Sequence, residues 1–252
     1  MTRYKVILEY DGTDLIGWQE NAQGPSVQSI LRDAIYSFCG ERVDIVGAGR
    51  TDAGVHAGAM VAHFDLGGKS DAETVMRALN FYLVNQPVSV LNCEIVADDF
   101  NARFDCVARH YKYIVLNRSA KPVLNKNRVW WVPRKLNVSA MKRAAEHLIG
   151  KHDFTSFRAS ECQAKSPIKT LDTCIITKRG DEIIFEFSAR SFLHHMVRNM
   201  VGTLVEIGAG KPYDIDEILA AKNRSAAGPT APADGLYFIG ADYASDACDS
   251  GK

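Results

Sequence analysis

The run Gly-Ala-Gly-Arg-Thr-Asp-Ala-Gly-Val-His-Ala, residues 47–57, surrounds one carboxylate, Asp52, with small residues and places Arg50 two positions before it. Glycine permits backbone conformations that other residues avoid, and a nearby arginine favours the ionised form of an acid. A plain turn between two strands is the alternative for a loop rich in Gly and Asp. A dinucleotide fingerprint is excluded because Asp52 stands where its third glycine belongs, and a P-loop because Gly-Lys-Ser/Thr is missing. The run therefore predicts a loop that presents an acid.

Strand and helix patterns alternate on both sides of this loop. Alternating apolar residues and turn signals predict strands at 4–10, 43–48, 59–66 and 88–96. Apolar residues at helical spacing predict one helix between Ser26, its N-cap, and Gly40, its stop, and a second at 71–83. The order strand-helix-strand-strand-helix-strand is typical of a ferredoxin-like domain.

The second half of the chain repeats this theme with insertions. Strands are expected at 109–116, 130–131, 171–177, 182–188 and 236–243, and helices at 139–148, at 193–207 and after an N-cap at Asp214. We predict an α+β fold of two ferredoxin-like α/β domains, residues 1–103 and 104–244, followed by a tail at 245–252. Their mainly antiparallel sheets are expected to adjoin and to form a central cleft.

Charge is segregated along a chain whose formal net charge is zero. Residues 101–170 contain fifteen Lys and Arg against four Asp and Glu, so the rest of the chain is acidic. A basic surface of this kind attracts phosphates, although a solvated charged face is the alternative. The six cysteines form no Cys-x-x-Cys pair, and no apolar run reaches membrane-spanning length. We therefore expect a soluble cytoplasmic protein with reduced thiols and no membrane partner.

Five motifs in order carry a resemblance to a known family, and the resemblance covers the chain from about Tyr4 to Tyr243. They are the run at 47–57, Arg-His-Tyr-Lys-Tyr at 109–113, His-Asp-Phe-Thr-Ser-Phe-Arg at 152–158, Phe-Leu-His-His-Met-Val-Arg-Asn-Met-Val-Gly at 192–202, and Ala-Gly-Pro-Thr-Ala-Pro-Ala-Asp-Gly-Leu-Tyr at 227–237. In these motifs the chain resembles the TruA family of tRNA pseudouridine synthases. His110 departs from the pattern, because relatives often carry an arginine there.

The resemblance implies a reaction and the residues that perform it. Uridine in tRNA, at positions 38, 39 and 40 of the anticodon stem-loop, would become pseudouridine without a cofactor or a metal. Asp52 corresponds to the nucleophile, which forms a covalent intermediate. Tyr111 corresponds to the tyrosine that stacks on the flipped uracil and takes part in removing the C5 proton, and Arg198 to the arginine that pairs with the aspartate. The resemblance also implies a homodimer in which one tRNA spans both subunits.

Further side chains are candidates for binding the RNA, and other functions stay open on the residues alone. Arg50, Arg158 and His194 are the candidate substrate contacts beside Tyr111. A metal-assisted hydrolase is one alternative, although no His-x-x-x-His pair and no Cys/His quartet at ligand spacing is found. A non-catalytic RNA-binding protein is the other, and it would explain the basic segment but not the Asp52 loop.

Overall fold

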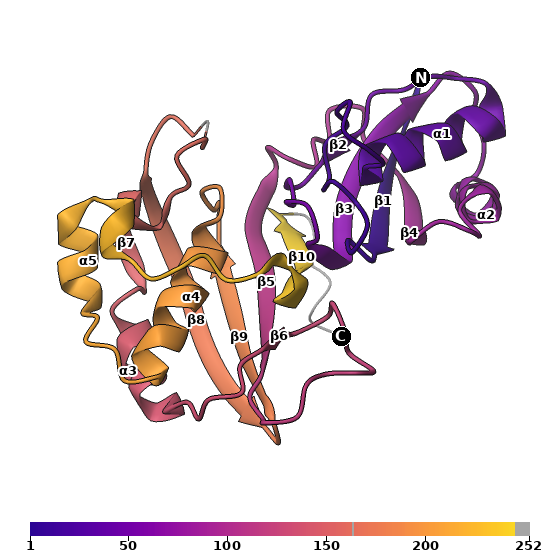
Figure 1. Ribbon diagram of the computed structural model, residues 1–252. Helices are drawn as coiled ribbons and strands as arrows, with labels where there is room; N and C mark the ends of the chain where they lie inside the picture. The colour runs from indigo at the N-terminus through magenta and orange to yellow at the C-terminus, as the bar shows by residue number, and fades with distance from the viewer. Residues whose placement is uncertain (163, 245–252) are drawn as a thin grey trace, which may run out of the picture. The chain divides into compact units, whose positions relative to one another are not determined.

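The computed structural model describes residues 1–162 and 164–244 of the 252-residue chain. The chain divides into two units (Figure 1). Unit 1 contains residues 1–109 and the C-terminal residues from Tyr237, and unit 2 contains residues 110–236. Each unit combines a mainly antiparallel sheet with helices, which confirms the expected α+β class. No helix of the described residues is long and apolar enough to cross a membrane.

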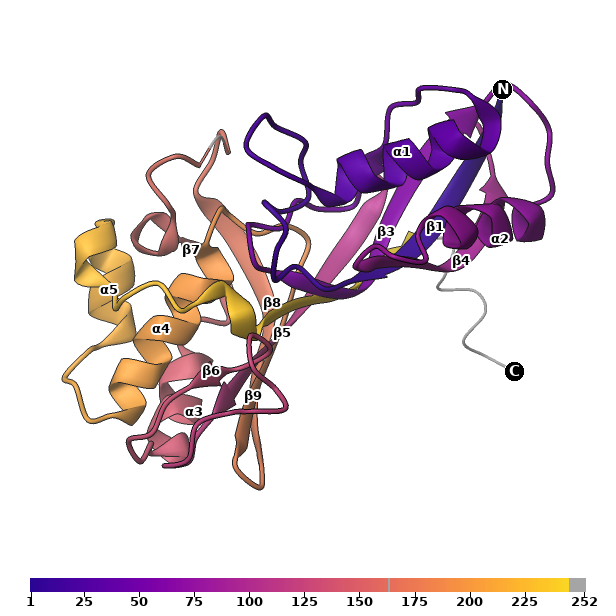
Figure 2. The same ribbon diagram turned by 45° about the vertical axis from the view of Figure 1, so that its right-hand side comes forward.

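Unit 1 has the element order that the sequence predicts. It consists of β1 (Thr2–Tyr10), α1 (Val27–Cys39), β2 (Val46–Gly47), β3 (His56–Leu66), α2 (Ala72–Tyr82) and β4 (Val88–Val96), joined by β10 (Leu236–Tyr243). β1 lies between β4 and β3 and is antiparallel to both, and β2 pairs with β3. Figure 2 shows α1 and α2 on the same side of these strands, where Tyr4, Leu8, Phe64, Leu31 and Ile35 form a fully buried core.

Capping residues in the sequence determine where the two helices of this unit begin and end. The Ser26 hydroxyl accepts a hydrogen bond from the Ser29 amide at 3.1 Å, and Gly40 ends α1 at φ +74. The Asp71 carboxylate accepts from the Thr74 amide at 2.8 Å and caps α2 in the same way. The sequence-based limits of both helices are therefore confirmed to within a residue.

Two features of unit 1 differ from expectation. The strand expected at 43–48 is reduced to β2, because side chains of α1 occupy the carbonyls before it: Gln28 Nε2 donates to Ile45 O at 2.8 Å and Arg32 Nε to Val43 O at 3.2 Å. The last strand, expected in a second domain at 104–244, instead belongs with unit 1. It pairs in parallel with β3, with Tyr237 opposite His56 and Phe238 opposite Ala57.

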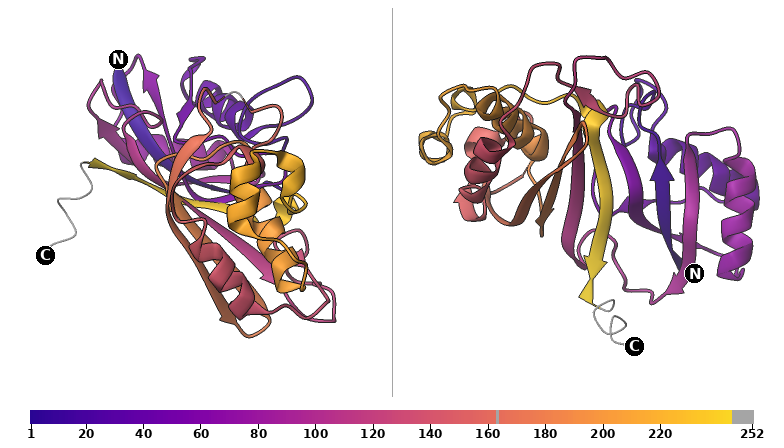
Figure 3. Two further views of the ribbon diagram at one scale, coloured as in Figure 1. Left: turned by 90° about the vertical axis from the view of Figure 1, so that its left-hand side faces the viewer. Right: turned by 90° about the horizontal axis from the view of Figure 1, so that it is seen from below.

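Unit 2 is built on a four-stranded path. Its elements are β5 (Cys106–Leu116), β6 (Trp130–Trp131), α3 (Val138–Glu146), β7 (Gly150–Asp153), the 3-10 turn η1 (Thr155–Phe157), β8 (Ile168–Arg179), β9 (Glu182–Ala189), α4 (Met196–Gly208), α5 (Ile215–Ala221), and the 3-10 turns η2 (Arg224–Ala226) and η3 (Ala233–Gly235). The strand order is β5-β9-β8-β7, and β6 pairs with β5. The right-hand view of Figure 3 shows the three helices on one side of these strands.

The start of α4 corrects one sequence-based limit. The apolar stripe predicted a helix from Leu193, but α4 begins at Met196. His195 has φ +60, a left-handed conformation that a helix does not continue through, so residues 193–195 form a turn before it. Neither β7 nor η1 was expected from the residue pattern.

Candidate functional site

Asp52 lies on a loop that joins β2 to β3 in unit 1. Its neighbours Thr51 and Val55 are 8% and 1% exposed, whereas Asp52 is half-buried. The Val55 amide donates to the Asp52 carbonyl at 3.2 Å, and Gly54 has φ +79, which closes the turn. The backbone on both sides of Asp52 is thus anchored, while Asp52 itself is half-buried.

A second loop, residues 11–18, holds the Asp52 loop in place. The Trp18 amide donates to the Thr51 carbonyl at 3.0 Å, and the Gly54 amide donates to the Leu15 carbonyl at 3.3 Å. The Thr51 and Tyr10 hydroxyls form a buried hydrogen bond of 2.8 Å. These bonds satisfy backbone groups that would otherwise be buried without partners, and they fix one loop against the other.

The close approach of the two loops depends on Gly12 and Gly17. A Cβ on Gly17, whose φ is +106, would lie 2.5 Å from the Thr51 carbonyl oxygen, and a Cβ on Gly12 would lie 2.1 Å from that of Val55. Only glycine fits both positions. Sequence reasoning missed this contact, and the glycines themselves were its only signal.

His56 and Arg109 support the Asp52 loop from outside. The Gly12 amide donates to His56 Nδ1 at 3.1 Å, and the buried His56 ring stacks on Tyr237 at 4.8 Å between ring centroids. Arg109 Nε donates to the Ala48 carbonyl at 2.7 Å. Both residues hold the position of the loop.

Arg50 is exposed, and within the described residues its guanidinium makes no ion pair or hydrogen bond. It therefore forms no ion pair with Asp52. An exposed guanidinium on the Asp52 loop fits a contact to phosphate.

Tyr111 and Arg198 lie in unit 2. Tyr111 is on β5, is 8% exposed, and meets the edge of the Phe192 ring at 5.0 Å. Arg198 is the third residue of α4; its Nε donates to the Ala231 carbonyl at 2.8 Å, and the Ala231 amide donates back to the Arg198 carbonyl at 3.1 Å. The two bonds to Ala231 fix the orientation of the guanidinium.

His194 and His195 line a groove of about 540 Å³ that lies wholly within unit 2. Its other lining residues are Thr155, Arg158, Ala159, Ser160, Glu161, Asn199, Lys222, Asn223, Arg224 and Thr230. The two imidazole rings are 4.1 Å apart. Arg158 Nη2 donates to the carbonyls of Cys162 and, at 3.0 Å, Ala164, so it orders the loop after η1.

Arg224 is a functional candidate that sequence reasoning missed. Its Nη1 donates to Gly228 O at 2.9 Å, and its Nη2 to Asn199 Oδ1 and Thr230 Oγ1, both at 3.0 Å. Asn199 is fully buried and donates to Phe157 O at 2.8 Å, so the network ties α4 to η1 and to the 227–230 loop. Burial lowers the pKa of the Arg224 guanidinium. No spacing in the sequence signals this non-local network.

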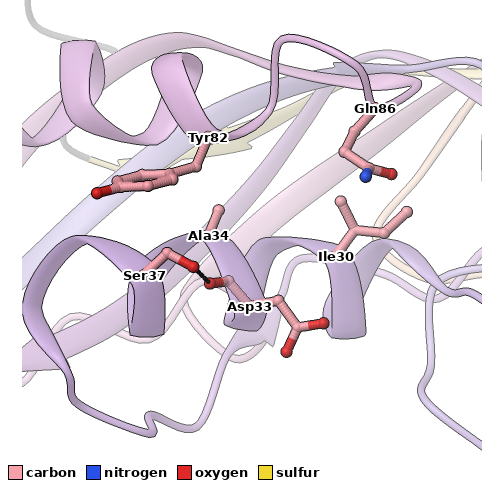
Figure 4. Close-up of a pocket in the computed structure, with 6 residues that line it drawn as sticks. All are labelled: Ile30, Asp33, Ala34, Ser37, Tyr82 and Gln86. Atoms are coloured by element: carbon pink, nitrogen blue, oxygen red, sulfur yellow. Dashed lines mark hydrogen bonds between the residues drawn. The ribbon is translucent and has the colours of Figure 1, made fainter.

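A second, smaller pocket of about 140 Å³ lies between α1 and α2 in unit 1 (Figure 4). It is lined by Ile30, Asp33, Ala34, Ser37, Tyr82 and Gln86, and the Ser37 hydroxyl donates to the Asp33 carbonyl at 2.8 Å. Because Asp33 is its single charged lining residue, this pocket is not suited to a polyanion.

Comparison with known proteins decides the family. A family model described as tRNA pseudouridine synthase matches residues 6–105 and 144–244. The tRNA pseudouridine synthase A of Rhodospirillum centenum is 55% identical over 245 residues, which cover 96% of this chain and 100% of that protein. This chain belongs to the tRNA pseudouridine synthase A family. The enzyme of the same description from Rhodopseudomonas palustris is 54% identical over the same share of each chain.

Family membership confirms the resemblance that the five motifs indicated, and it decides against a metal-assisted hydrolase and a non-catalytic RNA-binding protein. The matched residues contain Asp52 and Arg198, while Tyr111 lies between the two matched segments. A chain in the crystal structure of a Cbf5-Nop10-Gar1 complex matches 93% of this synthase and 48% of its own length, at 10% identity and a TM-score of 0.37. That likeness is too low to carry an argument.

Proposed function

We propose that this synthase converts uridine to pseudouridine at positions 38, 39 and 40 of the tRNA anticodon stem-loop, through a covalent intermediate on Asp52. The observation that carries the proposal is the 55% identity over 96% of the chain, which makes it a tRNA pseudouridine synthase and hence an isomerase. The braced loop, which holds the backbone around the half-buried Asp52, supports its role as the nucleophile.

The reaction cuts the bond between ribose C1′ and uracil N1 and joins C1′ to C5 of the same base. The base must leave its stack before it can react, and the C5 proton must be removed after the new bond forms. A covalent intermediate divides this exchange into two steps and keeps the detached uracil in place. Atoms balance without a redox partner, since the product is an isomer of the substrate.

Tyr111 and Arg198 are proposed to act on the same uridine as Asp52. Tyr111 would stack on the flipped uracil and take or relay the C5 proton, and Arg198 would pair with Asp52 and favour its ionised form. The fixed orientation of Arg198, held by Ala231, supports a pairing role. Arg50, Arg158 and His194 are proposed to contact the RNA.

Three wider features complete the proposal. Each half of the chain would follow a ferredoxin-like plan, and the two sheets would adjoin at a central cleft that receives the tRNA. The enzyme would act in the cytoplasm as a homodimer, with one tRNA spanning both subunits. The basic residues at 101–170 support a polyanionic substrate.

Release of tritium from C5-labelled uridine in tRNA tests the function. The wild-type enzyme should release tritium, and Asp52→Asn should abolish release while its tRNA affinity stays nearly intact, because binding rests on many Lys and Arg contacts. Asp44→Asn removes an exposed carboxylate outside the loop and is the matched control. Appreciable turnover by a purified Asn variant, free of deamidation, would remove Asp52 as the nucleophile.

A further inference from the structure

The groove in unit 2 carries an excess of positive charge. Arg158, Lys222 and Arg224 line it together with His194 and His195, while Glu161 is the one carboxylate in its lining. Three permanent cations against one anion in a concave space focus a positive potential there. The N-terminus of α4, where His195 is the N-cap, contributes the positive end of a helix dipole to the same groove.

The two guanidinium groups of the groove are held by neutral oxygens. Arg158 donates to the Cys162 and Ala164 carbonyls, and it also interacts with the Cys162 thiol. Within the described residues, Arg224 donates only to carbonyl, amide and hydroxyl oxygens, and none of its partners carries a charge. These bonds fix the side chains without cancelling their charge. Burial lowers the pKa of Arg224, because the guanidinium loses water and gains no carboxylate partner in its place.

Lys222 adds an exposed charge to the lining of the groove. Its side chain is 63% exposed, and Nζ lies 3.5 Å from Asp153 Oδ2, a weak ion pair that an arriving anion can replace. Its left-handed backbone, at φ +46, ends α5 and directs the chain into the η2 turn that bears Arg224.

We propose that this groove is a binding site for the phosphodiester backbone of the tRNA, with Lys222 as a contact beside Arg158. Arg224, whose Nη hydrogens are all donated within the protein, adds positive charge without a direct contact. The inference rests on the proposed function and deepens it by assigning a backbone site within unit 2. A volume of about 540 Å³ is large enough for a segment of backbone. The oriented Arg158 guanidinium can match phosphate oxygens in geometry as well as in charge, and Lys222 supplies a point charge.

Neutralising single phosphates tests the site directly. A series of anticodon stem-loops each carries one uncharged methylphosphonate next to a 2′-O-methyl ribose, and the 2′-O-methyl phosphodiester at the same position is the control for each. Binding to wild-type enzyme should weaken at one or two positions. In Lys222→Gln the same substitutions should cost less affinity, because the charge that met the phosphate is gone.

Lys211→Gln is the matched control, since Lys211 is exposed, lies in the same unit and is outside the groove. Lys222→Gln should weaken binding of unmodified tRNA severalfold and lower the salt slope by about one, whereas Lys211→Gln should change neither. Arg158→Lys should retain more tRNA affinity than Arg158→Gln, because the lysine keeps the positive charge that attracts the RNA. Equal losses would mean that Arg158 acts through its hydrogen bonds to the loop after η1. Circular dichroism checks that each variant is folded.

The possible results distinguish a failure of the proposed RNA-binding groove from a failure of the proposed synthase activity. Lys222→Gln should lower kcat/KM for tritium release, and most of the loss should lie in a raised KM. Equal effects of Lys222→Gln and Lys211→Gln, or phosphate losses that are the same in wild type and Lys222→Gln, would overturn the groove as an RNA site. The methylphosphonates could cost less affinity in Lys222→Gln than in wild type while the wild-type enzyme releases no tritium. That result would contradict the proposed function but would still support the groove as an RNA-binding site.

Discussion

Gly12 lies so close to Val55 that a Cβ on Gly12 would be 2.1 Å from the Val55 carbonyl oxygen. The Gly12 amide also donates to His56 Nδ1 at 3.1 Å. The two contacts clamp loop 11–18 onto the C-terminal side of the Asp52 loop. The position of the proposed nucleophile therefore depends on a residue forty positions away in the sequence.

Gly12→Ala should lower catalysis although it removes no reacting group. The added methyl must push the Val55 carbonyl away, and a displacement of about 1 Å at a reacting group can cost around a hundredfold in rate. Single-turnover tritium release measures the effect. Gly58→Ala, on β3, is the control, because a Cβ there meets no atom within 4 Å. An unchanged rate in Gly12→Ala would show that the loops do not position Asp52.

Sequence reasoning succeeded where one residue decides the local backbone. Ser26 and Gly40 bound α1, and Asp71 caps α2, because capping needs only a side-chain oxygen or a glycine at a fixed offset. The β8–β9 hairpin was likewise predicted from its turn residues, among which Gly180 has φ +59. Local chemistry of this kind can be read from a single sequence.

Sequence reasoning failed where side chains distant in the sequence bind the backbone carbonyls that a strand would otherwise use. The strand before the Asp52 loop is cut to two residues because Gln28 and Arg32 of α1 bind the carbonyls it would have used. The network of Arg224, Asn199 and Thr230 joins residues that no periodicity connects. The roles of Asp52, Tyr111 and Arg198 came from motif matching, and they stay predictions.

Binding of tRNA should fall steeply with salt although the net charge is zero. The excess of fifteen basic over four acidic residues at 101–170 acts locally, and each phosphate contact contributes about 0.7–0.9 to the slope of log affinity against log salt. Filter binding at several salt concentrations measures that slope. A flat dependence would contradict a basic RNA-binding surface.

Catalysis should be indifferent to EDTA. Isomerisation of uridine needs a nucleophile and a proton acceptor but no Lewis acid, and the sequence lacks the ligand spacing of common zinc sites. Tritium release is compared before and after chelation, with the tRNA folded beforehand and its fold checked by native gel. Loss of the chemical step with intact tRNA would revive the metal-assisted alternative.

The Arg3–Asp65 pair should make part of the stability of unit 1 dependent on pH. The two side chains face each other across β1 and β3 with both N–O distances at 2.7 Å, and the hydrogen bonds from Arg3 hold the pKa of Asp65 below its usual value. A depressed carboxyl pKa stabilises the fold above the unfolded pKa, and the gain is lost as pH falls through the folded value.

Asp65→Asn should therefore cost about 0.5–1 kcal/mol at pH 7, a figure that allows for solvent screening of a partly exposed pair. The difference from wild type should shrink below the ordinary Asp pKa of 3.8. Urea unfolding at pH 7 and pH 3 measures both values, with the exposed Glu73→Gln as control. An equal difference at the two pH values would mean that the charge of Asp65 is not what stabilises the strands.

Tyr111→Phe should separate stacking from proton transfer. The ring, which packs edge-on against Phe192 at 5.0 Å, is kept, while the hydroxyl that would take or relay the C5 proton is lost. We expect normal tRNA binding and a large loss of tritium release. Tyr111→Leu should also weaken binding, because stacking of a base on an aromatic ring is worth about 1–3 kcal/mol. Tyr82→Phe, at an exposed tyrosine of α2, should change neither measurement. Near-normal tritium release by Tyr111→Phe would leave Tyr111 a stacking role alone.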